Sequence, residues 1–493
     1  MKTLHGSLLL ALGALALAGM AHAQVPAGTW SGNDVSDANQ NTGMGTGALG
    51  GPTPTNLTGS YNTACGSQAL FSTTNGSANT ACGTSALYSN TTGSSNTGSG
   101  YQALYANTTG SQNSALGYGA LSNNIGGTLN TASGYYALRF NTEGTSNTAD
   151  GAYALINNTS SWNSAFGEGA LGGNTAGAYN TGVGAFALSS ATTANYNTAL
   201  GFSALYTNTT GADNTASGSN ALLSNTTGSD NTASGYSALF SNTVGNYNNA
   251  YGYFALHNNS GGSQNSASGV QALYGNKTGN YNTASGTDAL YSNTTGSTNI
   301  AEGYKAGYNL TTGSNNIDIG NLGVAAESGT IRIGTTSTQT KTYIAGIYGT
   351  SVTGSTVVVS STGQLGVTVS SERYKTAIAP MGSNTDKLQQ LRPVTFHLKT
   401  DPKGVLQYGL IAEDVAKVYP DLVIRNESGR IDGVRYDELA PMLLNEVQRQ
   451  ERRNAAQDEQ IAAQEARIRQ LITQLAELRA AVVIPHSSAG NAP

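Results

Sequence analysis

A pattern of apolar and polar residues recurs along most of this chain with a period of 17 residues, except for one step of 16 and a longer spacer after the first copy. Each copy holds a short apolar stretch, such as Ala221, Leu222 and Leu223, followed by polar residues that end in Asn-Thr-Thr-Gly or a close variant. A fixed period of this size indicates stacked structural repeats. The asparagines that open the 17 copies are Asn41, Asn62, Asn79, Asn96, Asn113, Asn130, Asn147, Asn163, Asn180, Asn197, Asn214, Asn231, Asn248, Asn265, Asn282, Asn299 and Asn316.

The residues of one copy favour β structure over helix. Each copy contains several Gly and Asn residues, which are poor helix formers, and its apolar stretch is too short for an amphipathic helix. Asn and Gly tolerate positive φ angles, so the end of each copy has the chemistry of a turn. We therefore expect one coil of a β-solenoid per copy, with two short strands and two turns, and coils stacked about 4.8 Å apart.

The apolar content of one coil is small, mainly Ala with one Leu and in some coils an aromatic residue. Side-by-side association of three chains would bury more apolar surface and would cover exposed strand edges. This layout resembles the β-roll heads of trimeric bacterial surface adhesins, although the repeat here is longer than theirs. That resemblance implies a homotrimer.

The composition excludes several classes of function. Gly accounts for 64 of the 493 residues and the net charge is −5, which suits a repetitive fibre and does not suit binding to nucleic acid. No His or paired carboxylate recurs in the repeat, so we expect neither a metal nor a cofactor there. Isolated carboxylates such as Asp150 and Glu168 are best explained as solvated groups.

The first 23 residues have the features of a bacterial export signal. Lys2 precedes the apolar run LLLALGALALAGM, and the small residues AHA precede Gln24. We expect a mature, exported chain that begins at Gln24 and is secreted or held at the cell surface. Cys65 and Cys82 occupy equivalent positions in adjacent coils, so they form either a disulfide between neighbouring rungs or a pair of free thiols.

The character of the chain changes after the repeats. We divide it into repeats at 24–320, a β-rich neck at 321–369, a small α+β domain at 370–442, a coiled-coil helix at 443–481 and a flexible tail at 482–493. The charges are concentrated in the last three parts, where 16 of the 22 Lys and Arg residues and 16 of the 27 Asp and Glu residues lie. The neck segments TIRIGTTSTQTKTYIAGIYG and STVVVSSTGQLGVTV alternate apolar and polar residues, which predicts strands in a narrow trimeric stalk.

The segment 443–481 has the heptad pattern of a coiled coil. Val447, Asn454, Ile461, Ile468 and Leu475 form one row, and Leu443, Gln450, Gln457, Gln464, Leu471 and Leu478 form the second. Polar residues in the middle of these rows would fix register and strand number at some loss of stability. A helix that packs only on its own domain is the alternative.

The segment from residue 370 to about 450 resembles the C-terminal intramolecular chaperone and auto-processing domain of phage tailspikes and endosialidases. In that family a Ser stands five residues before a Lys, with an Arg between them, as Ser370, Arg373 and Lys375 stand here. The segments LRPVTFHLK, YGLIAEDVAKVYPDLV and VRYDELAPMLLNEV follow in the family's order. The residue after the nucleophile is often Asp in the family and is Ser371 here, so Ser371 is the alternative nucleophile.

The resemblance implies that the chain cuts itself once between Val369 and Ser370. A serine hydroxyl needs a base to become a nucleophile, and Ser-Lys pairs are a known arrangement. Lys375 would be that base, which requires its neutral form and hence burial or a positive neighbour such as Arg373. The alternative is a linker serine beside an exposed lysine.

Taken together, the sequence predicts a mostly β, exported homotrimeric fibre whose C-terminal domain aids assembly and cleaves itself. One alternative is a phage-derived tail fibre that recognises a host, and another is a chaperone domain that does not cleave. A secreted polysaccharide-degrading enzyme and an ice-binding rod are further alternatives. A host-surface or glycan ligand is a candidate partner, but the sequence does not identify it.

Overall fold

The computed structural model describes residues 34–50, 57–345, 356–367, 369–426 and 428–482. The expected export signal lies outside these residues, as does most of the expected tail. The chain forms two compact units, Met1–Ala345 and Gly346–Pro493, which are described separately below. Within the described residues, no helix is both long and apolar enough to cross a membrane.

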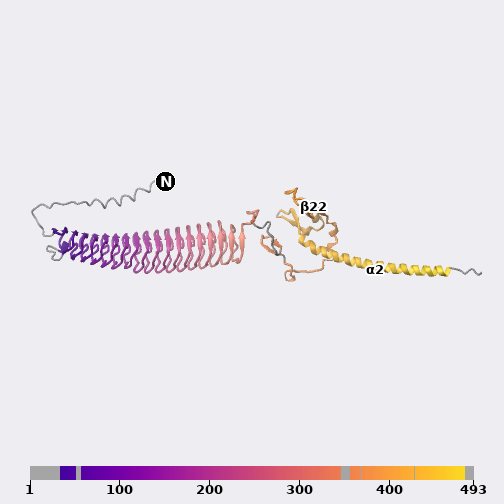
Figure 1. Ribbon diagram of the computed structural model, residues 1–493, viewed down its shortest axis with the longest axis horizontal. Coiled ribbons are helices and arrows are strands. Elements are labelled where there is room, and N and C mark those ends of the chain that lie inside the picture. The colour runs from indigo at the N-terminus through magenta and orange to yellow at the C-terminus, as the bar shows by residue number, and fades with distance from the viewer. Residues whose placement is uncertain (1–33, 51–56, 346–355, 368, 427, 483–493) are drawn as a thin grey trace, which may run out of the picture. The chain divides into compact units, whose positions relative to one another are not determined.

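The first unit is a solenoid with one strand per coil, and its coils follow one another along the chain from indigo to salmon in Figure 1. Its first strands are β1 (Asp34–Ser36), β2 (Thr42–Met44), β3 (Thr63–Cys65), β4 (Thr80–Cys82), β5 (Thr97–Ser99), β6 (Ser114–Leu116), β7 (Thr131–Ser133), β8 (Thr148–Asp150) and β9 (Ser164–Phe166). They continue as β10 (Thr181–Val183), β11 (Thr198–Leu200), β12 (Thr215–Ser217), β13 (Thr232–Ser234), β14 (Asn249–Tyr251), β15 (Ser266–Ser268), β16 (Thr283–Ser285), β17 (Ile300–Glu302), β18 (Ile317–Ile319) and β19 (Ile331–Ile333). A 3-10 turn, η1 (Ala48–Gly50), lies in the first coil.

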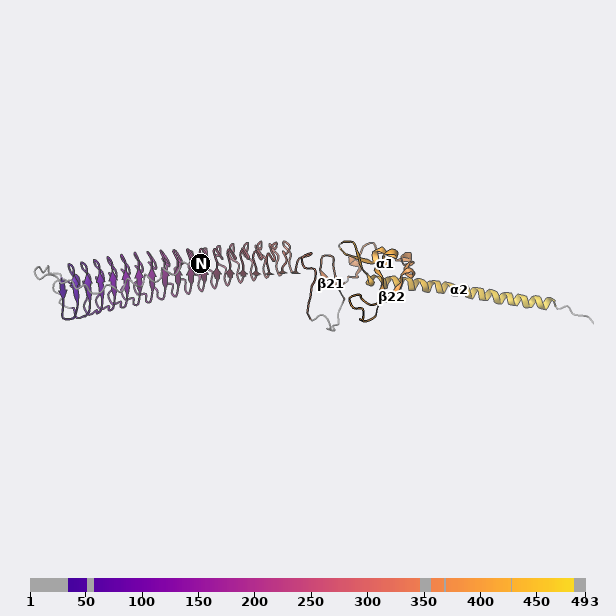
Figure 2. The same ribbon diagram turned by 90° about the horizontal axis from the view of Figure 1, so that it is seen from above.

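The strands form one 19-stranded sheet along one wall of the solenoid, as the arrows in Figure 2 show. From β2 to β19, each strand pairs in parallel with the strand of the next coil, and equivalent repeat positions face each other. At the start of the sheet, β1 pairs antiparallel with β2. The expected β-solenoid of 17-residue coils is therefore confirmed.

Each coil has one strand and not the two that the sequence suggested. The apolar stretch of a coil and the residue before it contain two left-handed residues, for example Asn220 (φ 59°) and Leu222 (φ 52°). Two such residues in three positions turn the backbone away from an extended strand. The N–H of Leu222 still donates to the carbonyl of Ala238 in the next coil at 3.0 Å, so this wall is hydrogen-bonded without being a regular strand.

Two columns of buried asparagines hold successive coils together. In the column that opens each repeat, the backbone N–H of Asn214 donates to Asn197 Oδ1 at 3.0 Å, and Asn214 Nδ2 donates to the carbonyl of Gly228 at 2.9 Å. In the second column, Asn225 Nδ2 donates to the same carbonyl of Gly228 at 2.8 Å. Buried amides of this kind stabilise a fold only when their partners are present. The opening column runs through every repeat, whereas Thr73, Ala191 and Leu310 interrupt the second column, and Asn174 Oδ1 has no partner among the described residues.

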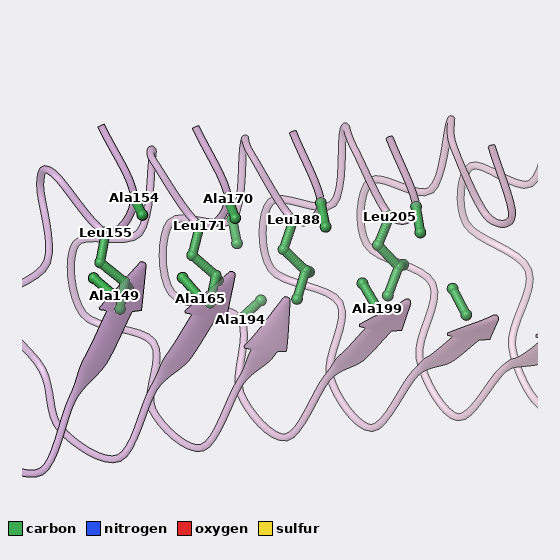
Figure 3. Close-up of a cluster of buried hydrophobic side chains, with 14 of the residues drawn as sticks. Ala149, Ala154, Leu155, Ala165, Ala170, Leu171, Leu188, Ala194, Ala199 and Leu205 are labelled. Carbon is green, nitrogen blue, oxygen red and sulfur yellow. The ribbon is translucent and has the colours of Figure 1, made fainter. Parts of the chain in front are cut away.

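The apolar core of the solenoid is complete within one chain. Leu188 and Leu205 are fully buried, as are Ala187 and Ala199, and Figure 3 shows leucine and alanine side chains that point into successive coils. We had expected that one chain would bury little and that neighbouring chains would complete the core. The expectation fails because the leucines stack on one another between the coils and the asparagine columns fill the rest of the interior.

The two ends of the solenoid sheet carry different carboxylates. At the first coil, the Asp37 carboxylate accepts hydrogen bonds from the backbone N–H groups of Asn39 and Asn41 and from Asn41 Nδ2, at 2.8 to 2.9 Å. At the last coil, Asp318 replaces the usual alanine of the strand and is fully buried. Neither of its carboxylate oxygens has a hydrogen-bond partner among the described residues.

Both neck segments that were expected to form strands contain them, and β19, in the first segment, extends the solenoid sheet. Within the described residues after β19, its strands are β20 (Val357–Val359) and β21 (Leu365–Val367), which pair as an antiparallel hairpin. All six residues of this hairpin are exposed within one chain, including Val357 and Leu365 at 61% and 67%. Apolar residues on both faces of an isolated hairpin need a partner surface to be stable.

The rest of the second unit is a small α+β domain that leads into a long helix (Figure 1). Its elements are the 3-10 turns η2 (Glu372–Tyr374), η3 (Gly382–Thr385), η4 (Leu388–Gln390) and η5 (Pro420–Leu422), the strands β22 (Pro393–Phe396), β23 (Gln407–Leu410), β24 (Val423–Arg425) and β25 (Ile431–Val434), and the helices α1 (Ala412–Val418) and α2 (Tyr436–Val482). The strands form two antiparallel pairs, β22 with β23 and β24 with β25. The expected strand, helix and strand pair after residue 392 are all present.

The core of this domain is small. Val415, Leu422, Val423 and Val434 are buried, and α1 packs on β25 and η5. The beginning of α2 is joined to the strands by Tyr436, whose hydroxyl accepts a hydrogen bond from the backbone N–H of Leu410 at 2.7 Å. These contacts explain why α2 begins before the heptad pattern does.

Candidate functional site

Ser370 and Lys375 flank the single helical turn η2. The backbone N–H of Lys375 donates to the carbonyl of Glu372 at 2.9 Å, which closes the turn and brings the lysine back toward the serine. Lys375 Nζ consequently donates to Ser370 Oγ over 3.3 Å. The structure thus brings together the two residues that the sequence proposed as base and nucleophile.

The sequence also suggested roles at this site for Arg373 and Ser371. The Arg373 guanidinium is over the ring of Tyr374, 4.9 Å from its centroid. In residues 369–426, no hydrogen bond or ion pair joins Arg373 to Ser370 or Lys375, and none joins Ser371 to Lys375. The geometry therefore favours Ser370 over Ser371 as the nucleophile and gives Arg373 no direct contact with the pair.

The Ser370–Lys375 pair is exposed to water within a single chain, as is the preceding residue, Val369. A lysine accepts a proton only in its neutral form, which burial favours and water opposes. The geometry of one chain supplies the contact between nucleophile and base but not the dry surroundings that would activate them. A reaction of the pair would therefore require a further surface that covers it.

Apolar side chains that could make such a covering contact are exposed throughout the second unit. Along α2, no residue is buried. The apolar members of the two heptad rows are each about half exposed: Leu443, Val447, Ile461, Ile468, Leu471, Leu475 and Leu478. Because these residues lie in the two heptad rows of a 47-residue helix, α2 carries an exposed apolar stripe along one side.

A polar network attaches this helix to the segment that follows the Ser370–Lys375 pair. Asn445 Nδ2 donates to the hydroxyl of the buried Thr385 at 2.7 Å, and Thr385 Oγ1 lies 3.3 Å from Glu446 Oε2. Arg449 pairs with Glu446 at 3.2 Å and also with Asp386. The sequence analysis did not identify these residues, since nothing in their spacing shows that residues 60 apart meet.

Cys65 and Cys82 lie side by side on neighbouring strands, as their repeat positions implied. They face each other in register between β3 and β4, and both are exposed free thiols in the structure. The pKa of the Cys82 thiol is raised, first by partial burial and then by the adjacent Cys65 thiol. Their positions allow the predicted disulfide, which stays a prediction.

Exposed aromatic side chains on the solenoid were also missed by the sequence analysis. Trp162, Tyr179 and Tyr196 stand at the same position of three successive repeats and stack on one another. The signal was present as an aromatic residue directly before three consecutive opening asparagines. It was overlooked because aromatics at this position are scattered elsewhere along the chain.

Comparison with known proteins gives one finding. Residues 370–424 match the family model described as the chaperone of endosialidase. This confirms the resemblance of the C-terminal domain, and the match begins at Ser370. No curated protein and no solved structure matches the chain.

The fold and this match define a β-solenoid fibre joined to a domain similar to the endosialidase chaperone.

Proposed function

We propose that this chain is the subunit of an exported homotrimeric surface fibre whose C-terminal domain guides assembly. The exposed apolar rows of α2 and the exposed hairpin β20–β21 support this proposal, because both need contacts that a single chain does not provide. The family match supports it independently, since trimeric assembly is the role that the family implies. The adhesin-like surface location rests on the expected export signal.

We further propose that assembly activates cleavage between Val369 and Ser370. Neighbouring chains would cover the Ser370–Lys375 pair and favour neutral Lys375, which would take the proton from Ser370 Oγ. The oxygen attacks the carbonyl carbon of Val369, the peptide C–N bond breaks, and the amine of Ser370 receives a proton. Water then hydrolyses the ester, which leaves a carboxylate on Val369 and releases residues 370–493.

The observation that carries the cleavage proposal is the 3.3 Å contact between Lys375 Nζ and Ser370 Oγ. Intact-mass spectrometry of purified full-length protein tests it. We expect two fragments for the wild type and for Ser371→Ala, and an uncut chain for Ser370→Ala and Lys375→Met. A wild type that remains uncut in a trimer would refute cleavage and would favour a chaperone that stays attached.

The role in assembly is tested separately with Ser370→Ala, which keeps the C-terminal domain on the chain. We expect sedimentation to show a trimer for this variant. A folded monomer at micromolar concentration would contradict the proposal of a homotrimer, whatever the cleavage experiment shows.

A further inference from the structure

Exposed apolar side chains gather on three successive coils of the solenoid, those containing β9, β10 and β11. Two residues before each of these strands stands an aromatic residue, Trp162, Tyr179 or Tyr196, with 56%, 51% and 57% of its surface exposed. Their rings stack almost in parallel, with interplanar angles of 4° and 5° and centroids 6.3 and 5.1 Å apart. The three rings form one continuous aromatic column.

A second apolar column runs beside the first. The register of the sheet aligns Phe166, Val183 and Leu200 at the ends of the three strands, and Phe166 and Leu200 are 41% and 51% exposed. The strand positions between the two columns carry hydroxyl side chains, and these are Ser164, Thr181 and Thr198. We call these nine residues the three-coil patch: an aromatic column, a hydroxyl row and an apolar column.

The three-coil patch is not a consequence of the repeat. In the coil before it the corresponding positions hold Ser146, Thr148 and Asp150. In the coil after it they hold Asp213, Thr215 and Ser217. Aromatic residues occur at the same position in other coils, but their neighbours there are not aromatic. Concentrated exposed apolar surface with polar borders is typical of a binding site.

The charged residues around the three-coil patch restrict the charge of the ligand that it could bind. No Lys or Arg occurs between Arg139 and Lys277. The charged residues nearest to it in the repeat are acidic: Asp150, Glu168 and Asp213. An anionic polymer or an anionic lipid surface would be repelled and would find no cation to pair with. The charges therefore exclude an anionic partner, and a neutral partner needs no charged group from the protein.

The size of the three-coil patch excludes a second copy of the chain as its main occupant. Three rungs at about 4.8 Å and four residues of strand give an area of roughly 200 Å². A stable protein interface buries about 800 Å² on each partner. The three-coil patch instead matches a short, flat ligand that has both apolar faces and hydroxyl groups.

We propose that the three-coil patch binds a neutral glycan segment of about three sugar units. A pyranose ring presents apolar C–H faces and polar hydroxyl edges. The aromatic and apolar columns would contact the C–H faces, and the Ser and Thr row would exchange hydrogen bonds with the hydroxyl groups. The carboxylates of Asp150 and Asp213 at the two borders would accept further hydrogen bonds from sugar hydroxyls. The proposal gives the surface fibre a ligand class and requires neither trimer formation nor cleavage.

The test compares two triads of substitutions at the same repeat position. In the first, Trp162→Ser, Tyr179→Ser and Tyr196→Ser remove the aromatic column, and Ser95 and Ser146 show that serine is native at this position. In the control, Tyr61→Ser, Tyr247→Ser and Tyr281→Ser remove exposed tyrosines that do not stack on another aromatic ring of this position. All six residues have positive φ, so both triads change backbone strain alike. Circular dichroism melting checks that both are folded.

Full-length protein is measured by affinity gel electrophoresis against neutral laminarin, mannan and xyloglucan, and against anionic alginate and polysialic acid. We expect retardation by at least one neutral polysaccharide, an affinity about tenfold weaker in the first triad, and no change in the control. The proposal is overturned if no neutral polysaccharide retards the wild type, if only the anionic ones do, or if both triads bind like the wild type. It is also overturned if the first triad alters the sedimentation coefficient of the Ser370→Ala trimer while glycan binding is unchanged, because the patch would then be a protein contact.

Discussion

The solenoid and the C-terminal unit bury their apolar residues in different ways. In the solenoid, a column of leucines such as Leu188, Leu205 and Leu222 is fully buried by one chain. In the C-terminal unit, most valines and leucines of the β20–β21 hairpin and the apolar members of the heptad rows of α2 are about half exposed or more. The apolar core of the solenoid is thus complete within one chain, whereas the C-terminal unit leaves many apolar residues exposed.

This difference changes the physical argument for a chaperone domain. A rod made of identical coils would face a problem of register if its core formed between chains. Here each coil pairs with the next coil of its own chain, so chain connectivity sets the register of the sheet. In the proposed trimer, the part that would have to be aligned between chains is therefore the segment after the solenoid, which lies closest in sequence to the domain similar to the endosialidase chaperone.

The largest effect is expected from charges placed in the apolar rows of α2. Ile468→Asp with Leu471→Asp should abolish the trimer, because two carboxylates on each of three helices cannot be buried in a coiled coil. If assembly activates cleavage, this variant also stays uncut. The solenoid should keep its circular dichroism signal and melt as a monomer. Sedimentation and intact-mass spectrometry measure the two effects.

The matched control is Ala463→Asp with Ala466→Asp, which adds the same charges outside the two heptad rows of the same helix. We expect it to remain trimeric and to be cut like the wild type. If the control dissociates as readily as the row variant, the heptad rows are not the contact surface. If Ile468→Asp with Leu471→Asp abolishes the circular dichroism signal of the solenoid, the solenoid does not fold independently of the C-terminal unit.

A large effect confined to the solenoid is expected at the glycine that follows each strand. Gly184 has a φ of 126°, and a Cβ there would lie 2.5 Å from the carbonyl oxygen of Gly201 in the next coil. Gly184→Ala should lower the free energy of unfolding by about 2–3 kcal/mol, through backbone strain and displacement of the next coil. Urea denaturation of the monomeric α2 variant measures this change without a contribution from assembly.

The control lies in the same coil. Gly182 occupies the strand position that is alanine in most coils, such as Ala199 and Ala216, and has an ordinary negative φ. Gly182→Ala should leave stability unchanged or raise it by up to about 1 kcal/mol. If both variants lost the same free energy of unfolding, crowding within the coil, and not the left-handed backbone of Gly184, would explain the loss.

The period, the stacking of coils and the Ser370–Lys375 contact could be predicted because each follows from spacing along one chain. The number of strands per coil could not, because left-handed φ at non-glycine residues such as Leu222 has no signature in composition. The asparagines of the closing Asn-Thr-Thr-Gly were interpreted as turn residues, whereas Asn225 is buried and hydrogen-bonded. That difference in interpretation explains why the core was expected to need three chains.

The exposure of Ser370 and Lys375 could not be predicted from the sequence either. Motif spacing showed that the two side chains could meet, but burial depends on which surfaces surround them in the assembly. The expectation that Arg373 would act on the lysine had the same weakness, since its guanidinium lies over Tyr374 within one chain.

A comparable effect, dependent on pH, is expected at the C-terminal end of the solenoid. Burial, together with the nearby Glu327 carboxylate, raises the pKa of Asp318 to about 6, and the Arg332 guanidinium only partly opposes this. The folded chain then binds a proton at Asp318 more tightly than the unfolded chain, so this group lowers stability as the pH rises from about 4 to about 6.

The substitution Asp318→Asn should remove this loss of stability at higher pH. Because the pKa differs by about 2 units between the folded and unfolded chains, the variant should be more stable than the wild type by up to about 3 kcal/mol at pH 7 and similar to it at pH 4. Urea denaturation of the monomeric α2 variant at the two pH values measures the difference. Destabilisation at pH 7 would instead show that the charged Asp318 has a stabilising partner.

The smallest effect is expected at the N-terminal end of the solenoid. Asp37 lies there and, unlike Asp318, has hydrogen-bond partners. Although burial acts to raise it, the hydrogen bonds from Asn41 and Asn39 hold the pKa of Asp37 below its usual value. This group therefore stabilises the first coil at neutral pH, and the stabilisation is lost as the pH falls through the folded pKa.

Asp37→Ala should cost about 1 kcal/mol, confined to the first coil, because the N–H of Asn41 loses its partner. Hydrogen exchange at pH 7 should show faster exchange at Thr42 and unchanged exchange in the coil of Thr198. Faster exchange in both coils would mean that the solenoid unfolds as one unit, so that no coil is stable apart from its neighbours.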